Sequence, residues 1–109
     1  MSVEVAVDNK NKYITVKGEL TVDTVMNALS LFNRECKALS EWVVDFTGIT
    51  RVDSTALALL IELKRNAKQK NKSVSFIYLP TALITIARLS QLEDLITTNE
   101  NKKGAKSLA

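Results

Sequence analysis

The stretch Thr50–Arg65, TRVDSTALALLIELKR, joins a polar triplet to an unusually apolar run. Asp53-Ser54-Thr55 stands directly before six consecutive apolar residues, Ala56–Ile61. Asp, Ser and Thr are preferred at the N-cap of a helix, because a side-chain oxygen accepts a hydrogen bond from an unpaired N–H of the first turn. We therefore predict a helix from about Thr55 to Lys70, with Asp53 or Ser54 as its N-cap.

The predicted helix has more apolar surface than one contact with a sheet requires. Leu57 and Ile61 lie to one side of the stripe that we expect to face the sheet. Either another element covers them, such as the helix predicted at Val25–Leu39, or they form a docking patch rimmed by charge. Both interpretations stay open. The stripe itself consists of four residues at helical spacing: Ala56, Leu60, Leu63 and Ala67.

The rest of the chain predicts strands alternating with helices. Alternating apolar and polar residues indicate a hairpin of two strands, Val3–Val7 and Tyr13–Lys17, with Gly18 ending the second. Thr21 or Asp23 is expected to cap the helix at Val25–Leu39. The later elements are a strand at Trp42–Phe46 that Thr47-Gly48 breaks, a strand at Val74–Leu79, a helix at Thr81–Leu89 after Pro80, and a short helical piece at Leu92–Ile96.

The order β-β-α-β-α-β-α predicts an α/β fold with a mixed sheet of about four strands and helices packed on it. Strands joined through a helix tend to be parallel, whereas a hairpin pair is antiparallel. We expect one domain over residues 1–96. Residues 97–109 have few apolar side chains and include Lys102, Lys103 and Lys106, so we expect a disordered basic tail there.

Composition excludes several classes of function. The chain of 109 residues has no histidine and three glycines, which excludes Ser-His-Asp catalysis, histidine metal sites and glycine-rich nucleotide loops. We therefore predict no catalytic residue, no metal and no cofactor. The single cysteine, Cys36, falls at an apolar helical position and is expected to be a buried small hydrophobe.

The charge pattern predicts no nucleic-acid partner. The chain has 15 Lys+Arg against 12 Asp+Glu, and much of the excess lies in the tail. A nucleic-acid site needs a basic patch on the fold with aromatic residues nearby, and the aromatic residues here are scattered singly. We also expect no membrane span, since no apolar run reaches the roughly 18 residues that one needs, and no secretory signal.

The sequence VVDFTGITRVDSTALALLIEL, Val43–Leu63, resembles the central signature of STAS domains (sulfate transporter and anti-sigma-factor antagonist). In that family a strand ending in Asp-Leu-Ser precedes Asp-Ser-Ser-Gly-Leu at the start of a helix. VKGELTVDTV at Val16–Val25 and LITIARLSQLEDLI at Leu83–Ile96 resemble other parts of the family, so the resemblance spans roughly Val3–Ile96. It implies the STAS fold.

Two branches of the family imply different functions. In the STAS subunit of the Gram-negative phospholipid ABC transporter that maintains outer-membrane lipid asymmetry, the helix start resembles DSTALALLI here. That branch implies a cytoplasmic protein held at the inner membrane by the ATPase subunit and its permease. In anti-sigma-factor antagonists a partner kinase phosphorylates the hydroxyl that corresponds to Thr55, with Ser54 as the other candidate. The motifs GEL, RVD and IARL favour the transporter branch.

The transporter branch implies that the chain binds the ATPase subunit through the start of the Thr55–Lys70 helix and the neighbouring loop, and supports its assembly and activity. The residue after the hydroxyl pair, a glycine in the family, is Ala56 here, which narrows the room for a kinase around the hydroxyl. The residues expected at the interface are Asp23, Arg51, Asp53, Ser54, Thr55, Leu57 and Ile61.

Overall fold

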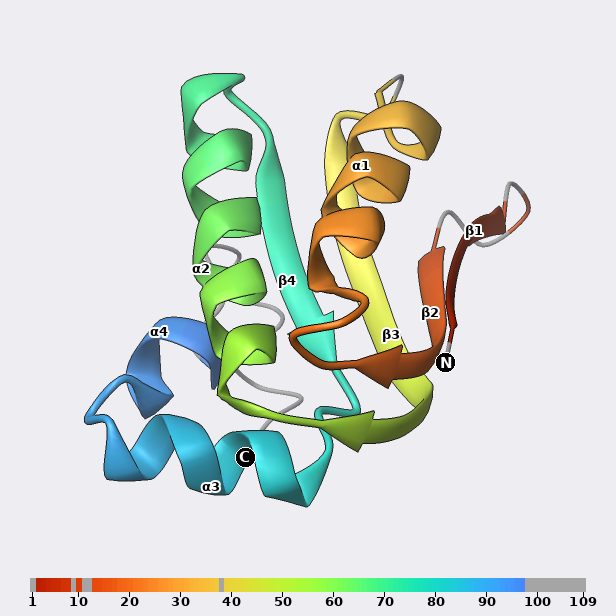
Figure 1. Cartoon of the computed structure of the whole chain (residues 1–109). Helices are drawn as coiled ribbons and strands as arrows, with labels where there is room; N and C mark the ends of the chain where they lie inside the picture. Colours follow the sequence, from red (N-terminus) through yellow and green to blue (C-terminus); the bar gives the residue numbers. More distant parts are fainter. Residues whose placement is uncertain (1, 9, 11–12, 38, 98–109) are drawn as a thin grey trace.

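A mixed sheet of four strands forms the centre of the molecule, in the spatial order β1-β2-β3-β4 (Figure 1). The computed structural model describes residues 2–8, 10, 13–37 and 39–97. β1 and β2 are antiparallel, whereas β2, β3 and β4 run parallel, so the predicted α/β order and mixed sheet are confirmed. The elements are β1 (Val3–Asp8), β2 (Tyr13–Leu20), α1 (Val25–Glu35), β3 (Glu41–Val52), α2 (Ser54–Gln69), β4 (Ser73–Ile77), α3 (Thr81–Leu89) and α4 (Glu93–Thr97).

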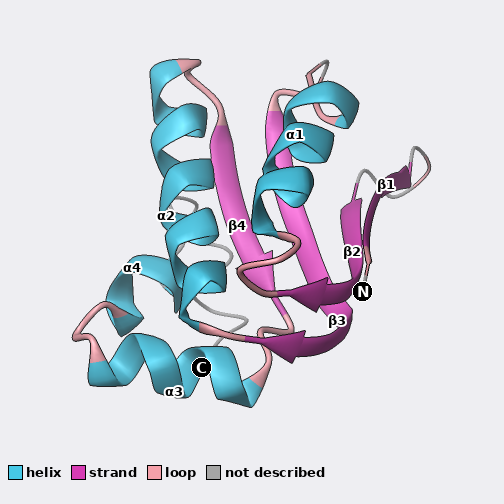
Figure 2. Ribbon diagram, in the orientation of Figure 1, coloured by secondary structure: helices cyan, strands magenta, loops and turns pink. Residues whose placement is uncertain are grey.

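Helices α1 and α2 lie side by side over one face of the sheet (Figure 2). Successive side chains of a strand point to opposite faces, so alternate residues of β2, β3 and β4 are buried under the two helices. The stripe predicted on α2 is buried completely or nearly so, which confirms that it faces the core. The largest buried side chains of the core are Trp42, Phe32, Phe46 and Phe76.

Helices α3 and α4 pack at one end of the molecule, where both contact α2 (Figure 1). α4 also contacts β4, and its Ile96 is completely buried. The predicted short helical piece is therefore present and closes the core. From residue 98 onward the predicted basic tail lies outside the described residues.

The prediction that Gly18 ends the second strand is wrong. β2 continues to Leu20, with a register shift against β3 at Gly18. Gly18 has a φ of +102°, and a Cβ at this position would lie 2.3 Å from the carbonyl oxygen of Ser2. Only glycine fits both the backbone conformation and the close approach, so this glycine permits a bulge inside the strand.

The prediction that Thr47-Gly48 breaks the third strand is also wrong, because β3 runs on to Val52. A Cβ at Gly48 would lie 2.7 Å from Cγ of Lys17 on β2. Gly48 therefore lets two strands pass closely instead of ending one of them. As a result, β2 and β3 end at Leu20 and Val52, shortly before α1 and α2 begin.

Three further boundaries differ from the prediction, and the first is the end of α1, which lies at Glu35 and not at Leu39. Thr24, not Thr21 or Asp23, is the N-cap residue of α1, because the N–H groups of Thr24 and Val25 donate to the carbonyl of Thr21 and wind a turn before the helix begins. β4 ends at Ile77, two residues earlier than predicted, since Tyr78 adopts a φ of 57° that a strand does not continue through.

Candidate functional site

Asp53 joins the start of α2 to the loop that precedes α1. Its Oδ1 accepts hydrogen bonds from the N–H of Thr55, at 2.9 Å, and from the Thr55 hydroxyl. Its Oδ2 accepts the N–H of Val22, also at 2.9 Å, across 31 residues of sequence. Of the two residues predicted as the N-cap of this helix, Asp53 and Ser54, the structure has Asp53 in that position. One carboxylate thus fixes two segments in a single arrangement.

These hydrogen bonds also set the ionisation of Asp53. The hydroxyl of Thr55 first, and then the N–H groups of Val22 and Thr55, hold the pKa of the Asp53 carboxyl below its ordinary value. Hydrogen bonds to the charged form favour that form. The carboxylate is therefore ionised at neutral pH.

Replacing Asp53 by Ala should cost about 1 kcal/mol of stability at neutral pH, the usual value of an N-cap. Because the folded-state pKa lies below the unfolded value, this stability is present above the ordinary pKa of about 3.8 and is lost as the pH falls through the folded-state pKa. Urea unfolding of wild type and Asp53→Ala should differ at pH 7, and the difference should shrink as the pH falls below the ordinary pKa of the carboxyl and through its folded-state pKa. Asp53→Asn, which keeps a capping oxygen, is the control, and a gap that persists at low pH would contradict this account.

The two hydroxyls at the start of α2 have different environments. Ser54 is exposed, whereas Thr55 is half-buried and its hydroxyl donates to Asp53. Ser54 therefore presents its hydroxyl to any molecule that contacts this end of the helix. Thr55 serves first to hold Asp53.

The charged residues predicted for the site lie around this helix start. Arg51 is exposed near the end of β3, in register with Glu19 of β2. Asp23 is exposed in the loop whose Val22 N–H is bound to Asp53. The fold therefore brings Asp23 and Arg51 to the same end of the molecule as the hydroxyls.

The two apolar residues predicted for the site are mostly covered by the chain itself. Leu57 is only 6% exposed and belongs to the core, and Ile61 is half-buried against it. Helices α1, α3 and α4 all contact α2, so other elements cover the surplus apolar surface of this helix. The apolar surface available at this end comes from different residues.

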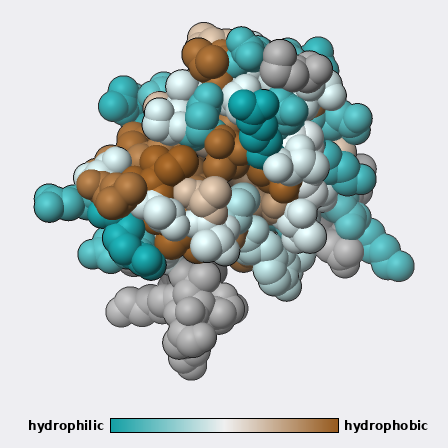
Figure 3. Space-filling view, turned by 60° about the horizontal axis from the view of Figure 1, so that its bottom comes forward, coloured by the Kyte–Doolittle hydropathy of each residue, from teal (hydrophilic) through white to brown (hydrophobic). Residues whose placement is uncertain are grey.

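Sequence reasoning missed Val22 and Met26, whose side chains are 66% and 71% exposed. Val22 lies in the loop bound to Asp53, and Met26 lies in the first turn of α1. Figure 3 brings the lower part of Figure 1 forward, where α3 also lies, and shows hydrophobic side chains gathered on that face. The sequence held one indication that Met26 is exposed, because Met26 lies off the stripe of α1 that contains the buried Ala28 and Phe32. We call this surface the candidate interface, and it comprises Val22, Asp23, Met26, Arg51, Asp53, Ser54 and Thr55.

Ala56, which replaces the glycine of the STAS signature, is completely buried. Its methyl group packs in the core beneath the candidate interface and does not project from it. The substitution therefore strengthens the helix and its packing without obstructing the surface.

Ala56→Gly should lower the stability by about 1–2 kcal/mol, since it removes a buried methyl group and a helix-favouring residue. The affinity of a partner for the candidate interface should change by less than about twofold, or about 0.4 kcal/mol, because the methyl group of Ala56 is buried and does not reach the surface. Urea unfolding and titration calorimetry measure the two effects separately. A large change in affinity at unchanged stability would mean that Ala56 contacts the partner.

The described residues offer little chemistry for catalysis. Among them, no group of three or more His, Cys, Asp and Glu side chains is placed to hold a metal ion. Cys36 is buried, as predicted, and burial raises the pKa of its thiol to about 11. It is therefore a protonated, unreactive thiol at neutral pH. No helix in the part of the chain that the structure covers has the length and apolarity to cross a bilayer.

Comparison with known proteins identifies the family. Residues 3–97 match the profile of the Mlab STAS domain. The fold is similar to that of the anti-sigma factor antagonist SpoIIAA in its unphosphorylated form, with a TM-score of 0.67 and 11% identity over 97% of this chain and 95% of that one.

A second similar structure is an uncharacterized DUF3478-family protein with a SpoIIAA-like fold from Shewanella loihica PV-4. Its TM-score is 0.51, with 14% identity over 99% of this chain and 94% of that one. A comparison with curated protein sequences gives no match. The two structural likenesses, at such low identity, establish the SpoIIAA-like fold, and the profile match over nearly the whole chain establishes more: the chain belongs to the Mlab STAS-domain family.

Proposed function

We propose that this protein is a non-catalytic STAS subunit of a phospholipid ABC transporter that maintains outer-membrane lipid asymmetry. It binds the ATPase subunit at the cytoplasmic face of the inner membrane and supports its assembly and activity. The observation that carries the proposal is membership of the Mlab STAS-domain family over residues 3–97. The candidate interface supplies a surface suited to such binding.

The candidate interface combines apolar anchors with a polar centre. Val22 and Met26 are exposed apolar side chains just before and within the first turn of α1, and Ser54 is exposed at the start of α2. Buried apolar anchors usually carry most of the binding energy, while charges at the rim contribute less. Leu57 belongs to the core and Ile61 packs against the core, so both hold α2 in place below the candidate interface.

The arrangement is also preorganised for binding. The carboxylate of Asp53 already holds the loop and the start of α2 together, so little conformational freedom is lost when a partner binds. A surface of this kind needs no catalytic group, in agreement with a non-enzymatic role.

The test is affinity purification of the tagged protein from its native cells, with mass spectrometry of the retained proteins and of its own phosphopeptides. We expect an ABC ATPase with its permease, and unmodified Ser54 and Thr55. A Met26→Asp variant purified in parallel should lose the ATPase. Absence of any ABC ATPase from the wild-type sample would refute the proposal.

The alternative function is that of an anti-sigma factor antagonist switched by phosphorylation. The reason to test it is the similarity of the fold to that of the anti-sigma factor antagonist SpoIIAA. A phosphate on Thr55 would break its hydrogen bond to Asp53 and add negative charge beside that carboxylate. The half-burial of Thr55 and this hydrogen bond favour the transporter role. Retention of a small kinase together with a phosphate on Thr55 or Ser54 would reverse that preference.

A further inference from the structure

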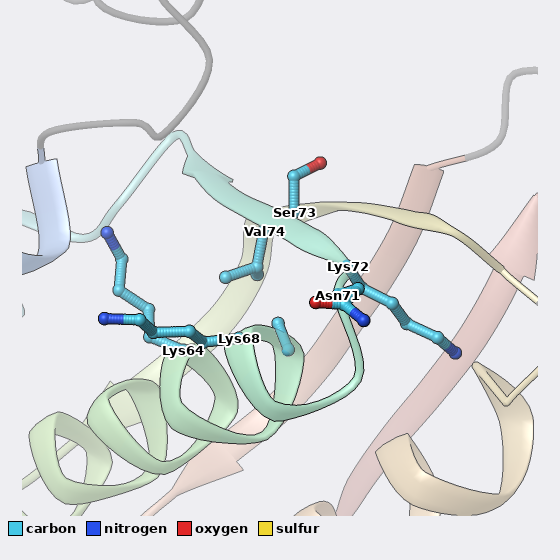
Figure 4. A pocket seen from close by; sticks show the side chains of 7 residues that line it. Lys64, Lys68, Asn71, Lys72, Ser73 and Val74 are labelled. Atoms are coloured by element: carbon cyan, nitrogen blue, oxygen red, sulfur yellow. The ribbon is translucent and has the colours of Figure 1, made fainter.

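Helices α1 and α2 cover only one of the two faces of the sheet (Figure 2). Figure 4 shows the alternation of side chains at the start of β4, where Val74 points toward α2 and Ser73 points away from it. On the side of Ser73 lie the strand residues that alternate with the buried ones, within 4–8, 13–17, 41–47 and 73–77. None of these described residues is itself buried. We call this side of the sheet the open face.

An open face is unusual for strands that run parallel. A parallel sheet is normally covered on both faces, whereas an antiparallel sheet often has one face in water. Here β2, β3 and β4 are parallel, and the open face carries apolar residues at its centre. Tyr13 is 41% exposed and lies in register with Val43, which is half-buried like Ile77 on β4. The face therefore has apolar surface that a further segment can cover.

Acidic residues surround this apolar centre. Glu4 of β1 and Glu41 of β3 are exposed, and neither forms an ion pair within the described residues. Asp45 lies on the same face and accepts hydrogen bonds from the N–H and the hydroxyl of Thr47. Lys17, in register with Glu4, supplies the positive charge of the described part of the face. The open face is therefore negative overall.

Beyond the described residues the chain continues with a segment of the opposite charge. Residues 98–109, TNENKKGAKSLA, contain three lysines and one glutamate, with too few apolar residues to form a core of their own. The helix before this segment, α4, ends at Thr97 and contacts the edge strand β4, so the segment starts beside the sheet. Its twelve residues reach about 40 Å when extended, whereas the four strands span roughly 15 Å from β1 to β4.

We propose that residues 98–109 dock on the open face, with their lysines beside its carboxylates and Leu108 on its apolar centre. Because the segment is tethered, its effective concentration at the face is about millimolar, so weak exposed ion pairs are enough to hold it there. A second molecule reaches the open face only by displacing the segment. The candidate interface lies around the starts of α1 and α2 instead, so this inference does not rest on the proposed function.

The test is paramagnetic relaxation enhancement, measured by NMR on the full chain with a nitroxide attached to Ser107→Cys. Cys36 is completely buried, so the label reacts at position 107. The amides of Ala6 and Thr15, on the two strands furthest from β4, should lose about half of their signal or more. The amide of Asn33, exposed on α1 over the opposite face, should keep most of its signal.

A charge variant of the segment tests what holds it. On β1 and β2 the enhancement should fall at least about threefold when the three lysines of the segment are neutralised, because the ion pairs with the open face are lost. The variant is Lys102→Gln/Lys103→Gln/Lys106→Gln. Sodium chloride at about 1 M, where the Debye length is only about 3 Å, should weaken the enhancement in the unsubstituted segment to a similar extent.

The matched control removes three positive charges from exposed lysines elsewhere on the chain. The enhancement on β1 and β2 should then stay within about 1.5-fold, since isolated surface charges contribute little. The control variant is Lys37→Gln/Lys68→Gln/Lys70→Gln. An equal fall of the enhancement in the two triple variants would overturn the proposal.

The pattern of signal loss separates the other occupants of the open face. Loss confined to residues next to Thr97, or equal loss on α1 and on the strands, would refute docking and leave the face open to a partner. A mixture of spin-labelled chain with nitrogen-15-labelled chain that has no nitroxide tests for a second copy. Enhancement on the open face in that mixture would show that the segment of another molecule docks there, and it would refute docking within one chain.

Discussion

Replacing Met26 by Asp should weaken binding of the proposed partner, an ABC transporter ATPase subunit, by at least about 100-fold, or about 2.7 kcal/mol. Met26 is 71% exposed and stands beside the loop that Asp53 holds in place. In the complex its side chain is expected to be buried, and a carboxylate at such a position must be desolvated without a partner. The loss should appear mainly as faster dissociation, measured by biolayer interferometry with the purified ATPase subunit.

The same substitution should leave the fold intact. Met26 lies in the first turn of α1, which has no acidic residue, and a negative charge there interacts favourably with the helix dipole. Asn33→Asp adds the same charge about two turns further along α1 at an exposed position and should change the affinity by less than about twofold. Unchanged affinity in Met26→Asp would move the interface away from the starts of α1 and α2.

Replacing Gly18 by Ala should lower the free energy of unfolding by about 3 kcal/mol. Two costs combine. The φ of +102° is a conformation that a residue with a Cβ rarely adopts, and the new Cβ would lie 2.3 Å from the carbonyl oxygen of Ser2. Neither cost is easily relieved, because the N–H of Glu19 donates to that same carbonyl at 3.0 Å.

Urea unfolding followed by circular dichroism measures this loss. Lys17→Ala, at the exposed neighbouring position of β2, is the control and should change the stability by no more than about 0.5 kcal/mol. Equal midpoints for Gly18→Ala and Lys17→Ala would show that the bulge accepts an ordinary residue.

The α2 helix shows how much of this fold the sequence allows one to predict. Its cap at Asp53 and its buried stripe follow from local rules, namely a hydrogen-bonding side chain before an apolar run and apolar residues at helical spacing. The order of strands and helices follows from the same rules. These features depend on residues that are neighbours in sequence.

The errors concern contacts between distant residues. The local pattern predicts strand ends at Gly18 and Gly48, but the lack of a Cβ at these positions allows the close approach of Ser2 and of Lys17. No local pattern distinguishes a glycine that ends a strand from one that lets a neighbouring chain pass. The helix cap at Thr24 was missed for a similar reason, since its hydroxyl donates to Glu19 at the end of β2.

The candidate interface was predictable in part. Asp53, Ser54 and Arg51 follow from the helix start and from the family resemblance. The sequence alone could not rank Val22 and Met26 as interface residues, because the exposed fraction of each depends on how α1 packs against the sheet. Leu57 shows the converse: it looks like surplus apolar surface along the helix but is buried once α2 has its neighbours.

The position of Ile96 has a consequence for how the protein is made. This residue is completely buried on the last described helix, against a core built from much earlier parts of the chain. During synthesis, the apolar surface that α4 covers stays open until Ile96 has left the ribosome. Folding of the nascent chain therefore finishes only after residue 96 has emerged, and a premature stop shortly before it yields a product with an exposed core that proteases and chaperones recognise.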